Sequence, residues 1–249
     1  MSSGLVWRGA WGEGVAAAAE GPLVLFASWA RGEPERGRYD DAELASWRKA
    51  AVAARRRSVP VWVVVHAGAL PDWQIAREGW LDPDALANWG CWVDRLGRAL
   101  LEAVDGWVAL WDPIAEASWY EGDARRVGRV LLDAQAAAYL QLHRGAGAGG
   151  TPVGAAVSVE PPGARGVRGR VLTRAHRWAT EAWVRAASTG RLEPPFALTG
   201  ELPNGTSALD VVVVMGTGDA TALTTGRRVI VIGEAAVGGA DVLARIAAG

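Results

Sequence analysis

A carboxylate directly follows a strand-like run in the segment WVALWDPIAEASWYEG, residues 107–122. The apolar residues from Trp107 to Trp111 end abruptly at Asp112-Pro113, and further acids and aromatics follow. A carboxylate at the end of a strand can serve as a general acid or base. An Asp-Pro pair is also a typical turn that simply ends a strand. The sequence leaves both interpretations of Asp112 open.

Six more positions carry groups that could do chemistry or bind a ligand. Glu234 follows the apolar run RRVIVIG, where it is either a second catalytic carboxylate or an acid favoured by the dipole at a helix start. His66 ends the run VWVVVH and is either a ligand contact or a hydrogen-bonded structural residue. After Asp112 come Glu116, Trp119, Tyr120 and Glu121, which either line a binding site or belong to a solvated loop.

Strands and helices must position these groups, and the chain alternates between the two patterns. The expected strands are short apolar runs at Gly4–Trp7, Pro22–Ser28, Pro60–His66, Gly106–Trp111, Pro152–Val159, Ala208–Met215 and Arg228–Ile232. The expected helices are the Ala- and Arg-rich segments Asp41–Arg57, Pro83–Val104, Asp123–Arg144 and Leu172–Ser188.

The strand runs are nearly continuous in apolar residues, as expected for parallel strands covered on both faces. Alternation of strand and helix predicts right-handed crossovers and a parallel sheet. The fold class is therefore α/β, and the 249 residues fit one domain spanning 1–249. A (β/α) barrel and an open doubly wound sheet satisfy the pattern equally well.

Composition excludes several classes of partner. The net charge of -1 argues against a nucleic-acid partner, which would favour a basic face. No apolar stretch reaches the roughly 18 residues of a membrane helix. The start MSSGLVWRGAW lacks the pattern of a secretion signal, so we expect a cytoplasmic protein with no membrane partner.

Neither a metal nor a cofactor is expected. The three histidines include no pair with metal-ligand spacing. The glycine-rich segments RGAGAGG and MGTGDAT lack the order and the lysine of nucleotide-binding loops. Fourteen tryptophans indicate a large aromatic core, although a sugar-stacking cleft would also be rich in tryptophan.

Five segments, in order along the chain, resemble the family 1 glycoside hydrolases, the β-glucosidase family. LFASWARGEPERGRYDDAELASW is similar to that family's S-W-x-R-x-x-P-x-G segment, and VVVHAGALPDWQIAREGWLDPDAL to its H-W-x-L-P … G-G-W-x-N segment. WVALWDPIAEASWYEG is similar to W-x-T-x-N-E-P … G-Y-x-x-G. LLDAQAAAYLQLHR resembles the helix L-L-x-A-H-A-x-A-x-x-x-x-R, and RRVIVIGEAAVGGADV the I-T-E-N-G strand end.

The resemblance implies a TIM-type (β/α) barrel whose site lies at the carboxyl-terminal mouth of the strands. It also implies that Asp112, on the fourth strand, is the catalytic acid/base and Glu234, on the seventh, the nucleophile. Retaining chemistry would need the two carboxyl groups about 5 Å apart. His66 matches the family's sugar-binding histidine.

Other positions depart from the family's pattern. Asp112 is one methylene shorter than the family's glutamate, and Trp111 replaces an asparagine that would contact the sugar. Val24 replaces an arginine, and Met215-Gly216 replaces Asn-Tyr, so the partners that keep the nucleophile ionised are missing. We therefore expect ordinary retaining β-glycosidase activity to be lost or altered.

The family's last strand has no recognisable counterpart, because the chain continues for only 15 residues after Glu234. The expected barrel is minimised. It closes with seven strands, keeps an open edge, or has that edge covered by another chain. We expect a homo-oligomer that buries the edge.

The sequence thus predicts a barrel that binds a sugar-like or other small molecule at its mouth. The expected ligand contacts are His66, Trp111, Glu116, Trp119 and Tyr120. Three alternatives stay open: a residual glycoside hydrolase using Asp112 and Glu234, a repurposed barrel enzyme of specialised metabolism, and a noncatalytic assembly partner.

Overall fold

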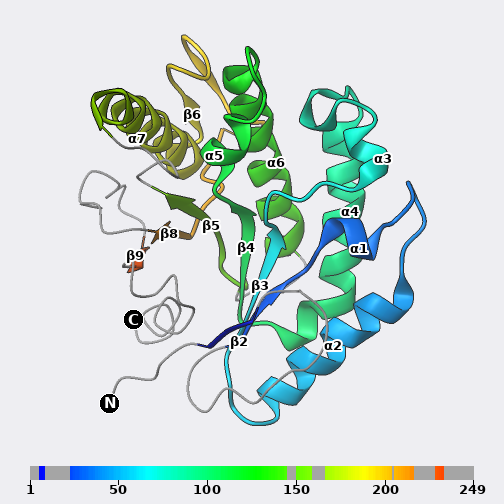
Figure 1. Ribbon diagram of the computed structural model, residues 1–249. Coiled ribbons are helices and arrows are strands. Elements are labelled where there is room, and N and C mark those ends of the chain that lie inside the picture. Colours follow the sequence, from blue (N-terminus) through cyan, green and yellow to red (C-terminus); the bar gives the residue numbers. More distant parts are fainter. Residues whose placement is uncertain are drawn as a thin grey trace.

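The computed structural model describes residues 6–8, 23–144, 150–158, 166–203, 205–215 and 228–232. Within them the chain has an α/β fold in which helices cover a parallel sheet (Figure 1). The sheet strands are β1 (Val6–Arg8), β2 (Leu23–Phe26), β3 (Val61–His66), β4 (Gly106–Trp111), β5 (Val153–Ser158), β8 (Val211–Met215) and β9 (Arg228–Ile232).

The helices are α1 (Trp29–Gly32), α2 (Asp41–Arg55), α3 (Asp72–Ile75), α4 (Ala85–Leu100), α5 (Pro113–Ala117), α6 (Ala124–Arg144) and α7 (Gly166–Thr189). Two 3-10 turns, η1 (Gly79–Leu81) and η2 (Leu101–Ala103), flank α4, and a hairpin of β6 (Arg191–Leu192) and β7 (Gly200–Glu201) follows α7. The seven strands and four long helices predicted from the sequence are each confirmed, with ends that shift by a few residues.

The strand order separates the two topologies that the sequence left open. The order is β1-β2-β3-β4-β5-β8-β9, and every neighbouring pair is parallel. A doubly wound sheet reverses its strand order at a switch point. Here the strands follow chain order without a reversal, as they do around a barrel.

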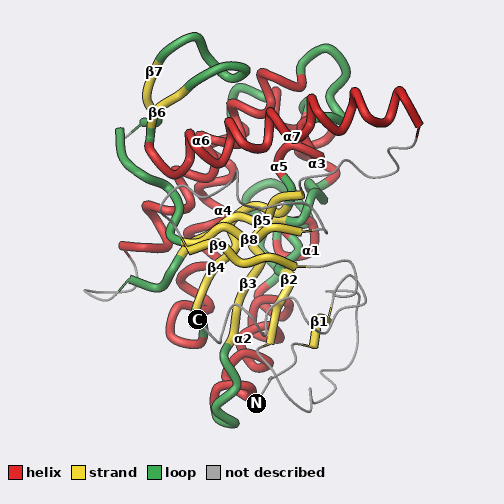
Figure 2. Tube along the Cα trace, turned by 90° about the vertical axis from the view of Figure 1, so that its left-hand side faces the viewer, coloured by secondary structure: helices red, strands yellow, loops and turns green. Residues whose placement is uncertain are grey.

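The helices also pack in chain order on one side of the strands. Helix α2 contacts α4, α4 contacts α6, and α6 contacts α7. Figure 2 shows the strands grouped at the centre, with α7 and the β6–β7 hairpin beyond their upper end. Within the described residues, no helix is long and apolar enough to cross a membrane.

The two faces of the strands belong to different clusters of buried side chains. On β3, Val61, Val63 and Val65 join the main core beneath the helices, whereas Trp62 and Val64 belong to a smaller cluster on the opposite face. This alternation follows from the period of two along a strand. The smaller cluster contains Val24, Trp62, Val64, Val108, Ala156, Val211 and Val213, with Phe26 and Trp111 packed against it. It fills the interior of the barrel with side chains.

Tryptophan supplies much of the main core, as the composition indicated. The indoles of Trp29, Trp80, Trp89, Trp92, Trp107 and Trp183 are fully buried. Those of Trp29, Trp80 and Trp89 contact one another with ring centroids 5.7–6.2 Å apart. These rings hold the loop after β3 against α4, beneath the end of the strand.

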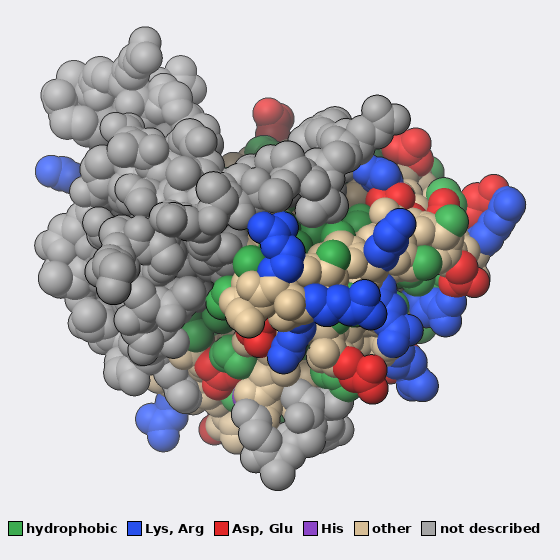
Figure 3. Space-filling view, turned by 90° about the horizontal axis from the view of Figure 1, so that it is seen from below, with side chains coloured by type: hydrophobic (Ala, Val, Ile, Leu, Met, Phe, Trp, Pro, Cys, Tyr) green, Lys and Arg blue, Asp and Glu red, His purple; other side chains and the backbone are tan. Residues whose placement is uncertain are grey.

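Charges of both signs share the surface. On the face seen from below, the described part carries lysine and arginine side chains with acidic side chains between them (Figure 3). Ion pairs join α2 to the segment before β4, with Arg48 3.8 Å from Glu102 and Arg55 3.3 Å from Asp105.

Candidate functional site

His66 and Glu116 form a buried pair between the ends of β3 and β4. The Nε2 atom of His66 lies 2.9 Å from both carboxylate oxygens of Glu116, and the Nε1 of Trp80 donates to Oε1 at 2.5 Å. Their side chains are 1% and 2% exposed. Glu116, for which the sequence left a ligand-lining position and a solvated loop open, lies on the short helix α5 with a buried side chain. His66 has the hydrogen-bonded environment of the structural interpretation.

Both carboxylate oxygens of Glu116 take part in hydrogen bonds, Oε1 with Trp80 and His66 and Oε2 with His66. The Nδ1 atom of His66 is buried and has no hydrogen-bond partner among the described residues. The pair is thus held in one geometry by the fold.

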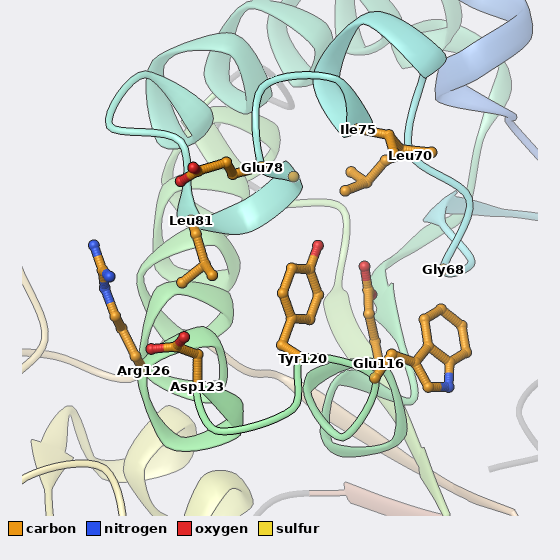
Figure 4. Close-up of a pocket in the computed structure, with 11 residues that line it drawn as sticks. Gly68, Leu70, Ile75, Glu78, Leu81, Glu116, Tyr120, Asp123 and Arg126 are labelled. Carbon is orange, nitrogen blue, oxygen red and sulfur yellow. The ribbon is translucent and has the colours of Figure 1, made fainter.

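A pocket of about 620 Å³ opens beside this pair, between the loops that follow β3 and β4. Its lining residues are Gly68, Leu70, Ile75, Glu78, Gly79, Leu81, Glu116, Trp119, Tyr120, Asp123 and Arg126. Figure 4 shows the Glu116 carboxylate and the Tyr120 hydroxyl pointing in the same direction, toward the loop that carries Glu78 and Ile75. The volume falls within the range of small-molecule sites.

Tyr120 is held in place by the loop opposite. The backbone N–H of Trp80 donates to its hydroxyl at 3.2 Å. Gly79 has a φ of +61°, and a side chain there would collide with the Tyr120 hydroxyl. Burial raises the pKa of Tyr120; the Trp80 hydrogen bond opposes this effect, and the Glu116 charge adds to it. The phenol therefore stays protonated at neutral pH and keeps an O–H to donate.

The rim of the pocket combines an exposed aromatic ring with charges. Trp119 is 66% exposed, and its ring passes over Gly68, where an added Cβ would lie 3.0 Å from the indole. Glu78, Asp123 and Arg126 also reach the rim, and within the described chain no ion pair joins them to each other. These side chains can therefore meet a ligand.

Asp112 lies in a different environment. Its φ of 53° is left-handed, and its backbone N–H donates to the carbonyl of Ala156 at 2.7 Å. Its carboxylate accepts from the Oγ of Ser158 at 2.5 Å and from the Ser158 N–H at 3.4 Å. The conformation is that of the turn residue, and the carboxylate ties the end of β4 to the end of β5.

Ser158 and His176 extend this contact, and the sequence did not single out either residue. The Nε2 of His176, on α7, lies 3.2 Å from the Oγ of Ser158 and 3.1 Å from its carbonyl oxygen. His176 is 8% exposed. Both residues lie within elements predicted from the sequence, but no local signal indicates that α7 brings His176 onto the end of β5.

The remaining predicted site residues are separated from the pocket. Trp111 packs against Phe26 on the inner face, with ring centroids 5.3 Å apart and an angle of 66°. Glu234 lies outside the described residues. The structure thus brings His66, Glu116, Trp119 and Tyr120 together, whereas Asp112 and Trp111 do not line this pocket.

No group of three or more potential ligand side chains that could hold a metal ion occurs within the described residues.

The fold has clear relatives among solved structures. A β-glycosidase from Pyrococcus horikoshii is 21% identical with a TM-score of 0.65, over 80% of this chain and 49% of that one. A β-glucosidase from Exiguobacterium marinum is 16% identical with a TM-score of 0.63, over 85% and 52%. A family 1 β-glucosidase from Thermotoga maritima is 16% identical with a TM-score of 0.64, over 79% and 50%.

The fold is a (β/α) barrel like that of the family 1 glycosidases. Neither a protein-family model nor a curated protein matches the sequence. The chain spans about half the length of these solved structures, and at these identities the likeness establishes the barrel fold alone.

Proposed function

We propose that this family 1 glycosidase-like barrel binds a sugar-like small molecule and does not carry out ordinary retaining hydrolysis of β-glycosides. The binding site is the pocket between the loops after β3 and β4. The observation that carries the proposal is its lining, in which the exposed ring of Trp119 stands beside Glu116 and the Tyr120 hydroxyl. An aromatic surface next to hydrogen-bonding groups suits a polyhydroxylated ring, which has apolar faces and polar edges.

The surroundings of Asp112 support the second part of the proposal. Its carboxylate is engaged within the fold, because it accepts hydrogen bonds from the hydroxyl and the backbone N–H of Ser158. Acid catalysis would instead require a carboxyl group aimed at the leaving group of the substrate. On the described part of the inner face, apolar side chains stand where the family's polar groups would be, because Val24 is fully buried there and Trp111 packs against Phe26.

Calorimetric titration with methyl β-D-glucoside and turnover of p-nitrophenyl β-D-glucoside test the two parts separately. We expect the sugar to bind without hydrolysis of the chromogenic substrate. Trp119→Ala should weaken binding by roughly tenfold or less, because loss of a stacked ring costs about 1 kcal/mol. Trp178→Ala is the matched control, since Trp178 is also a partly exposed indole, 47% exposed, but lies on α7 and does not line the pocket.

The residual hydrolase is the competing function, and Asp112→Asn distinguishes it. Rapid turnover by the wild type that disappears in Asp112→Asn would overturn the proposal that hydrolysis is lost. Equal sugar binding by the wild type and Trp119→Ala would instead contradict the assignment of the pocket.

A further inference from the structure

We infer that the pocket selects ligands that carry a protonated amine, with an amino sugar as the ligand class. The inference rests on the proposed function and specifies the ligand of the same pocket. It starts from Glu116, whose carboxylate lines the pocket and pairs with no lysine or arginine side chain within the described residues.

The first step concerns the acceptor capacity of Glu116. Oε1 receives hydrogen bonds from Trp80 at 2.5 Å and His66 at 2.9 Å, whereas Oε2 receives only the His66 contact at 2.9 Å. An ionised carboxylate offers about four acceptor sites. Oε2 therefore has an acceptor site left for a donor from the ligand.

The second step concerns charge. The donors to Glu116 are the Trp80 indole and the His66 imidazole, and within the described residues no lysine or arginine side chain pairs with it. A carboxylate that is 2% exposed is costly to keep ionised, and a charged donor from the ligand would remove much of that cost.

The third step concerns the rest of the lining. Glu78 and Asp123 add two acids at the rim, and Arg126 is the single basic lining residue. Together with Glu116 this makes three acids to one base, which gives the pocket a negative potential. The aromatic rings of Trp119 and Tyr120 also line it, and aromatic faces attract cations through their quadrupole.

An ammonium group exploits these features better than a hydroxyl does. A sugar hydroxyl gives Glu116 one further hydrogen bond and leaves the charge in place. An ammonium at the same position gives a charge-assisted hydrogen bond and neutralises the carboxylate. The amine should therefore improve affinity far more than an added neutral group of similar size.

The test is calorimetric titration of the full chain with D-glucosamine, D-glucose and N-acetyl-D-glucosamine at about pH 6, where such an amine is protonated. D-glucosamine should bind roughly tenfold or more tightly than either neutral sugar, as one charge-assisted hydrogen bond predicts. The preference should shrink at high salt, because the rim charges are screened.

Two variants assign the effect to the pocket. Glu116→Gln can still accept a hydrogen bond from Trp80 but lacks the negative charge. This variant should therefore bind D-glucosamine about as weakly as it binds D-glucose. Glu78→Gln, at the exposed rim, should reduce the preference by roughly two- to threefold and serves if Glu116→Gln fails to fold. Glu102→Gln is the matched control, because Glu102 is 88% exposed and precedes β4, away from the pocket.

The outcomes separate the inference from the proposed function. If the wild type binds all three sugars with equal affinity and Trp119→Ala loses this binding, the amine selectivity is wrong but the sugar site is retained. Absence of binding for every sugar would overturn both. An amine preference that survives in both Glu116→Gln and Glu78→Gln would place the cation site elsewhere and refute the inference.

Discussion

At the residue scale, Asp112 is a turn residue that also joins two strands. Its left-handed φ of 53° suits asparagine as well as aspartate, and its side chain accepts from Ser158. Asp112→Asn should therefore cost about 1 kcal/mol or less of unfolding free energy, because its amide oxygen keeps one of the two hydrogen bonds from Ser158 and its NH2 group can donate to the Ser158 hydroxyl. Asp112→Ala should cost about 2 kcal/mol, since it also meets a steric penalty at positive φ.

Urea denaturation of the two variants measures this difference. Equal losses of unfolding free energy in the two variants would show that tolerance of the left-handed φ is not the contribution of Asp112 to stability. A loss well above these values in Asp112→Asn would show that the Ser158 and His176 contacts depend on the carboxylate charge.

At the scale of elements, the packing of β4 against β3 depends on a small residue. A Cβ on Gly106 would lie 2.5 Å from three ring carbons of Trp62, which is 5% exposed on the inner face. The indole cannot move without displacing its neighbours in the barrel interior. Gly106→Ala should therefore destabilise the protein by about 1–3 kcal/mol, the usual cost of overpacking a core.

Gly90→Ala, in the interior of α4, is the matched control for this substitution. Its Cβ would meet only the end of the Gln141 side chain at 3.3 Å, which can move. The helix favours alanine by up to about 1 kcal/mol, so this variant should be neutral or more stable. Thermal denaturation compares the pair, and a larger loss in Gly90→Ala would contradict the packing argument.

At the scale of the molecule, one continuous core joins the elements from β2 to β8. The main buried cluster runs from Leu23 to Val212 and includes residues of α2, α4, α6 and α7. We therefore expect one cooperative unfolding transition, with tryptophan fluorescence and far-ultraviolet circular dichroism coinciding. Two separated transitions would show that the chain divides into independent units.

The expected homo-oligomer remains a prediction at this scale. Light scattering at increasing protein concentration checks it, and a strict monomer throughout would contradict it.

The sequence by itself determined the secondary structure and the parallel character of the sheet. Continuous apolar runs mark strands buried on both faces, and periodic Ala- and Arg-rich segments mark the helices that cover them. These signals are local, so β3, β4 and β9 were located to within a residue at either end. The order of five segments that resemble the family 1 glycoside hydrolases also pointed to a barrel of that type, and the strand order and structural relatives bear out that fold.

Only the tertiary structure decided what the candidate site residues do. Whether Glu116 is solvated or buried depends on the end of β3 and the loop after it, which bring His66 and Trp80 to it from 50 and 36 residues away in the chain. The contact of Asp112 with Ser158 likewise joins residues 46 apart. Such contacts arise from the packing of separate elements, and no local pattern encodes them. Spacing along the chain therefore identified the carboxylates, and the fold determined that Glu116, and not Asp112, faces the pocket.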